Sequence, residues 1–116
     1  QWGAIAALKG PQTSVLNMVA SFDERRRFLV EALNAIPGIT CEDPVGAFYV
    51  FPNITGSGIN SFTLQQELLE RVGVATIAGT SFGKFGEGYL RLSYASSLQN
   101  IRLAVDRIKD YLSCCS

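Results

Sequence analysis

The sequence predicts a single α+β domain, a two-layer sandwich in which helices pack on one face of a small sheet. Apolar residues at helical spacing recur in four stretches, and short strand-like stretches lie between the last three of them. No internal repeat or linker divides the 116 residues, and a hydrophobic content of 47% is enough for one core. We therefore expect three to four strands in a mixed or antiparallel sheet.

The N-terminal third of the chain predicts two helices. The stretch QWGAIAALKG reads as a short helix ended by Gly10 and Pro11. It has almost no polar face, so we expect it to be buried against another surface. A long helix is predicted over 13–36, where Pro37 and Gly38 end it. Its apolar positions are Val15, Val19, Phe22, Leu29, Leu33 and Ile36.

The middle of the chain predicts strands and a third helix. AFYVF, residues 47–51, has strand composition, and ITC, residues 39–41, favours a further short strand. A helix is predicted over 61–72, with Asn60 and Ser61 as candidate N-caps. Its apolar face and its C-terminal glycine are Leu64, Leu68, Val72 and Gly73.

A glycine-rich segment, GTSFGKFGEG over 79–88, follows a predicted short strand over 74–78. The spacing of its glycines and lysine fits neither a Walker loop nor a dinucleotide fingerprint, so a phosphate site is not indicated. We expect a mobile hairpin connection that needs glycines at positive φ. Phe82 and Phe85 are unusual in such a loop, and they either cover a cleft or pin the loop down.

The last two predicted elements are a strand over 88–95 and a helix over 97–112 capped by Ser97. The helix carries a clean apolar stripe made of Leu98, Ile101, Val105, Ile108 and Leu112. In the strand, the period of two places Leu90, Leu92 and Tyr94 on one face and a lone arginine, Arg91, on the other.

Arg91 needs an anion, because a guanidinium keeps its charge at any working pH and presents five donors in a rigid fork. One interpretation is a structural ion pair with Glu42, Asp43 or Glu87. The other is a bidentate site for the carboxylate or phosphate of a ligand, to which the Ser93 hydroxyl adds a contact. The residue pattern alone leaves both interpretations open.

Composition excludes several classes of protein. Ten basic and ten acidic residues balance, so no surface for nucleic acid or membrane binding is indicated. The apolar runs are too short to span a bilayer, and no signal peptide is visible. The absence of histidine excludes Ser-His-Asp and Cys-His catalysis within the chain. The three cysteines, Cys41, Cys114 and Cys115, favour a reducing compartment, the cytoplasm, and no metal site is predicted.

Five segments, taken in order, resemble one known domain: QWGAIAALKGPQ, FDERRRFLVEALNAIPGI, GAFYVFPNI, GVATIAGTSFG and GYLRLSYASSLQNIRLAVDRI. They are similar to the C-terminal small domain of class I/II pyridoxal-phosphate (PLP) aminotransferases, in the aspartate aminotransferase superfamily. The resemblance implies that residues 1–12 form a helix that packs on a missing large PLP domain. Residues 13–116 would then be the small domain itself.

The resemblance also implies a function. The parent protein would be a homodimer that uses PLP to move an amino group between an amino acid and a 2-oxo acid. The arginine of the R-L-S-Y-A segment, Arg91, would bind the α-carboxylate of the substrate. Phe48 and Phe82 would line the substrate pocket.

The lysine that carries the cofactor in this family lies N-terminal to every segment seen here. Lys9, Lys84 and Lys109 do not match its motif, so no catalytic or cofactor-binding residue is assigned. We therefore expect the isolated chain to bind no PLP and to be inactive. Two alternatives remain: a piece of another PLP enzyme, such as a decarboxylase, lyase or synthase, or a free-standing regulatory module that binds a small ligand.

Overall fold

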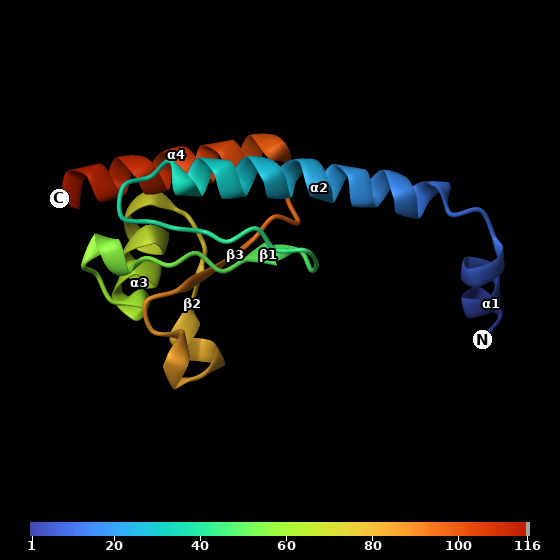
Figure 1. Ribbon diagram of the computed structural model, residues 1–116, viewed down its shortest axis with the longest axis horizontal. Coiled ribbons are helices and arrows are strands. Elements are labelled where there is room, and N and C mark those ends of the chain that lie inside the picture. Colours follow the sequence, from blue (N-terminus) through green and yellow to red (C-terminus); the bar gives the residue numbers. More distant parts are fainter. Residues whose placement is uncertain (116) are drawn as a thin grey trace.

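The computed structural model describes residues 1–115 and confirms the α+β class. Three strands form an antiparallel sheet in the order β1-β3-β2. Figure 1 shows α2 and α4 side by side along one side of this sheet, with α3 beside β2. The elements are α1 (Trp2–Lys9), α2 (Thr13–Asn34), β1 (Tyr49–Val50), α3 (Ser61–Val72), β2 (Ile77–Ala78), β3 (Leu90–Ser93) and α4 (Leu98–Cys115).

The central strand is β3, which pairs Leu92 with Val50 of β1 and Arg91 with Ile77 of β2. The predicted alternation along this strand is confirmed, because Leu90 and Leu92 are buried whereas Arg91 is only half-buried. The flanking strands are shorter than the sequence predicts. Residues 39–41 contribute only an isolated bridge between Thr40 and Asn53. Pro52 follows β1 closely and has no N–H to extend its ladder.

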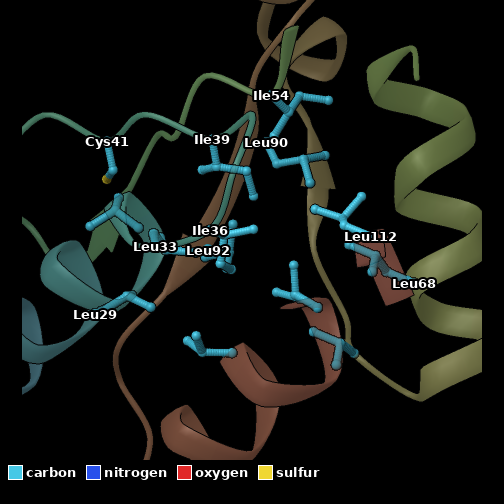
Figure 2. Packing of buried hydrophobic residues seen from close by; sticks show 14 of the residues in the cluster. Leu29, Leu33, Ile36, Ile39, Cys41, Ile54, Leu68, Leu90, Leu92 and Leu112 are labelled. Atoms are coloured by element: carbon cyan, nitrogen blue, oxygen red, sulfur yellow. The ribbon is translucent and has the colours of Figure 1, made fainter. Parts of the chain in front are cut away.

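The core lies between the sheet and the three larger helices. Figure 2 shows Leu33 of α2, Leu68 of α3 and Leu92 of β3 converging on one interior, to which Leu112 of α4 also belongs. The predicted stripe of α4 is confirmed, since Ile101, Val105, Ile108 and Leu112 are all buried. Helix α2 differs from its prediction, because within it only Leu29 and Leu33 are buried.

The N-terminal part of the chain extends beyond the domain. Figure 1 shows α1 at the far end of α2, away from the sheet. No residue of α1 is buried, and Trp2 is 87% exposed. Helix α2 runs past the sheet, so Val15 and Val19 are exposed as well and residues 1–115 offer α1 no surface to pack on. The expected burial of α1 against a further domain therefore stays a prediction.

We expect deletion of residues 1–10 to leave a cooperative unfolding transition and to reduce self-association. Every buried hydrophobic residue of the described chain lies between Leu29 and Leu112, so the truncation removes exposed apolar surface and no core contact. Thermal melts and sedimentation velocity on both chains measure the two effects. A 116-residue variant with Trp2, Ile5 and Leu8 replaced by Ser is the matched control and should also associate less. A truncated chain that no longer melts cooperatively would place α1 in the folding unit.

Candidate anion-binding site

The side chain of Arg91 lies on the face of the sheet opposite the core, between two aromatic rings. Its Cζ atom is 4.6 Å from the ring centroid of Phe82 and 5.0 Å from that of Tyr49. Tyr49 comes from the adjacent strand β1, and Phe82 comes from the glycine-rich segment. Rings at this distance attract a guanidinium and hold its plane. The two rings thus restrict where the arginine fork points.

Among the described residues, no anion neutralises Arg91. Within residues 1–115 its guanidinium forms neither an ion pair nor a hydrogen bond. Asp43 instead binds Arg26, 17 positions away in the sequence. The Glu87 carboxylate accepts hydrogen bonds from Ser61, and these hold the pKa of Glu87 below its usual value. The structural ion pair with Glu42, Asp43 or Glu87 is therefore wrong, and the donors of Arg91 are available to an external anion.

An aromatic wall lies beside the arginine; it consists of Tyr49, Phe51, Phe82 and Tyr89, of which Tyr49 and Phe82 contact Arg91. Phe51 stacks on Tyr89 with ring centroids 5.3 Å apart, and Phe51 and Phe82 form an edge-to-face pair with ring centroids 6.1 Å apart. Tyr49, Phe51 and Tyr89 also line a hollow of about 520 Å³ that is bounded by the turn over 42–47. The candidate anion site therefore borders an aromatic surface suited to the apolar part of a ligand.

The two phenylalanines proposed from the sequence occupy different places. Phe82 contacts Arg91 directly, whereas Phe48 meets the edge of the Tyr49 ring at 5.7 Å and lies one ring further away. Phe48 lines a separate hollow beside α2. Its turn is fixed because the Tyr94 hydroxyl donates a 2.7 Å hydrogen bond to the carbonyl of Ala47, a residue at φ +64°.

Sequence reasoning missed three members of the aromatic wall: Tyr49, Phe51 and Tyr89. A signal was present, because the period of two in AFYVF places Tyr49 and Phe51 on the same face, opposite buried Val50. Their meeting with Tyr89 depends on cross-strand register, which a single sequence does not supply.

The glycine-rich segment joins the antiparallel strands β2 and β3, which confirms the predicted hairpin connection. It folds into two short 3₁₀ turns, Gly79–Phe82 and Lys84–Gly86. The backbones of Gly79 and Gly86 are in contact, because a Cβ added to Gly79 would lie 2.0 Å from the Gly86 carbonyl oxygen. The predicted positive φ is confirmed at Gly83 and Gly88. Phe82 packs on Phe51 within the aromatic wall, while Phe85 is 88% exposed.

The lysines do not supply a covalent cofactor site beside Arg91. Lys9 belongs to the remote helix α1, Lys109 is exposed on α4, and the amine of Lys84 lies 5.1 Å from the ring of exposed Phe85. These three lysines therefore do not form a site that fits PLP within the described residues.

Cysteines and acidic residues among the described residues do not form a metal site either. No group of three or more His, Cys, Asp or Glu side chains able to hold an ion occurs in residues 1–115. Burial raises the pKa of the Cys41 thiol to about 11, whereas Cys114 and Cys115 are exposed at the end of α4. Of the described helices, none combines the length and apolar character needed to cross a membrane.

Comparison with known proteins places this geometry in a family. Residues 1–108 match the family model for aminotransferase class I and II. The chain belongs to this aminotransferase family. An aspartate aminotransferase of Pyrococcus horikoshii is 43% identical over 114 residues, which cover 97% of this chain and 29% of that protein. The chain thus spans less than a third of the length of such relatives.

Solved structures of aminotransferases contain the same fold. An alanine aminotransferase from Pyrococcus furiosus superposes with a TM-score of 0.90 at 32% identity, over 95% of this chain and 28% of that one. An aromatic aminotransferase from Pyrococcus horikoshii gives a TM-score of 0.88 at 36% identity, over 92% of this chain and 29% of that one. These aminotransferases are named for different substrates, so family membership does not identify the substrate side chain.

Proposed function

We propose that this chain is the small domain of a PLP-dependent aminotransferase and that Arg91 binds the α-carboxylate of its amino-acid and 2-oxo-acid substrates. The observation that carries the proposal is a guanidinium with no anion partner among the described residues, held between Phe82 and Tyr49 in a member of the aminotransferase family. Among the anions that a guanidinium binds, membership in this family favours a carboxylate.

The chemistry of Arg91 suits this role. A planar fork donates two parallel hydrogen bonds to a carboxylate, which fix the orientation as well as the position of the substrate. The aromatic rings limit rotation of the fork, so less conformational entropy is lost when the anion binds. Phe82 then forms the near wall of the substrate pocket, and Phe48 lies behind Tyr49 as a more remote wall.

The remaining parts of the site belong to the rest of a longer protein in this proposal. PLP supplies the electron sink of the reaction when bound, and the lysine that carries it lies outside residues 1–116. The exposed apolar surface of α1 and of the first half of α2 packs on the large domain. The complete enzyme is a cytoplasmic homodimer, and decarboxylase, lyase or synthase chemistry is the competing result of the assay below.

The proposal is tested on the full-length protein loaded with PLP. We expect amino transfer to 2-oxoglutarate from at least one of aspartate, alanine and phenylalanine, the donors suggested by the names of the relatives. Product amino acid and product oxo acid should appear in equal amounts, whereas a decarboxylase would release carbon dioxide. The 116-residue chain, assayed in parallel, should transfer no amino group and should lose added PLP on dialysis. PLP retained on one lysine of the short chain would refute our assignment of the cofactor site.

A further inference from the structure

We propose that Glu87 is a positioning residue whose carboxylate, docked on the N-terminus of α3, fixes the segment Gly79–Gly88 and so holds Phe82 against Arg91. The consequence of this positioning for catalysis rests on the proposed function of Arg91.

Glu87 contacts the N-terminus of helix α3. One carboxylate oxygen of Glu87 accepts the backbone N–H of Ser61 at 3.0 Å, and the other accepts its hydroxyl at 2.7 Å. Ser61 is the first residue of α3 and is fully buried. The first N–H groups of a helix have no partner inside the helix, and its positive end favours a carboxylate. Glu87 therefore supplies a cap from 26 positions away in the sequence.

Helix α3 also holds the other end of the same segment. The side-chain oxygen of Gln65 accepts the backbone N–H of Ala78 at 2.6 Å, immediately before the segment begins. Ser61 and Gln65 are four residues apart and so lie on one face of α3. One helix face thus anchors both the entry and the exit of the segment that carries Phe82.

A shift of the backbone at Glu87 is passed on to the turn that carries Phe82. The backbones of Gly79 and Gly86 touch, and the N–H of Gly79 donates to the carbonyl of Tyr89 at 2.8 Å. The backbone next to Glu87 therefore contacts the first 3₁₀ turn, Gly79–Phe82. Loss of the Glu87 anchor releases Gly86, and with it the turn that places the Phe82 ring 4.6 Å from Arg91.

The experiment follows the side-chain N–H resonance of Arg91 by NMR in the 116-residue chain. A ring beside a guanidinium shifts this resonance, and Phe82→Leu defines the part of the shift that depends on Phe82. Glu87→Gln removes the charge and one acceptor, so we expect the Phe82-dependent part of the Arg91 chemical shift to fall by at least about half. Glu87→Asp keeps the carboxylate and should retain more of this part of the shift. Glu70→Gln, a matched change of an exposed glutamate on α3, should leave it unchanged.

A double-variant cycle makes the assignment specific. If Glu87 acts through Phe82, then Glu87→Gln has no further effect on the Arg91 resonance in the Phe82→Leu background. An Arg91 resonance unaffected by Glu87→Gln, in a chain that remains folded, would overturn the positioning role. So would an equal effect of Glu87→Gln in both backgrounds.

Kinetics of the full-length enzyme separate this inference from the proposed function. Weaker placement of Arg91 should lower kcat/KM about threefold or more in Glu87→Gln, because the substrate carboxylate is then bound and oriented less well. An unchanged kcat/KM in a variant whose Arg91 resonance has moved would refute substrate binding by Arg91, while the positioning role of Glu87 would stand.

Discussion

Replacing Arg91 with Ala in the full-length enzyme lowers kcat/KM for amino-acid donors by about one to two orders of magnitude in our prediction. A charge-assisted contact to a carboxylate contributes roughly 1.5–3 kcal/mol, and each 1.4 kcal/mol is about tenfold. Loss of substrate orientation adds to this effect. Arg91→Lys should recover only part of the rate, because lysine keeps the charge but lacks the planar fork. Steady-state kinetics with one donor and one oxo acid measure the ratios.

A second arginine provides the control for this experiment. Arg102 lies on α4 with its Cζ atom 4.5 Å from the ring of Phe28, so Arg102→Ala also removes a charge that rests on an aromatic ring. It is exposed on a helix that packs on the core side of the sheet, whereas Arg91 lies on the opposite face, so its variant should retain kcat/KM. If Arg91→Ala kept the wild-type kcat/KM and lowered only the melting temperature, Arg91 would have a structural role and the proposed function would lose its main support.

Replacing Gly79 with Ala should destabilise the chain strongly and displace Phe82. The added Cβ would lie 2.0 Å from the carbonyl oxygen of Gly86 and 2.9 Å from that of Tyr89. Both obstacles are backbone atoms, so no side-chain rotation relieves the clash. Overpacking of this kind costs about 1–3 kcal/mol and occasionally more. We expect a loss of free energy of unfolding at or above the upper end of that range, measured by chemical denaturation.

Gly46→Ala is the matched control for this substitution, because a Cβ at Gly46 meets no atom within 4 Å. Its free energy of unfolding should differ from wild type by less than about 0.5 kcal/mol, as for an ordinary surface change. The Arg91 side-chain resonance should move in Gly79→Ala and stay in place in Gly46→Ala. Equal stability of the two variants would show that the two 3₁₀ turns can separate without cost, which contradicts the rigid segment described above.

The local elements of this protein are determined by its sequence. Helix α3 begins after Asn60, whose side chain accepts the N–H of Thr63 at 2.8 Å, and ends at Gly73 in the left-handed conformation, as the residues predict. Ser97 caps α4 in the same way. These features depend on residues within one turn of each other, so the sequence alone contains them. The family resemblance likewise follows from ordered local segments.

The surroundings of Arg91 at the candidate site depend on tertiary structure. Whether Arg91 has a protein partner depends on where Asp43 and Glu87 go, and each is bound by a residue far along the chain, Arg26 and Ser61. The exposure of Val15 and Val19 has the same cause, because helical spacing indicates an apolar face but not what lies opposite it. Cross-strand register similarly brings Tyr49 to Arg91. Long-range contacts select one partner among several that local physics allows, and so they decided the site.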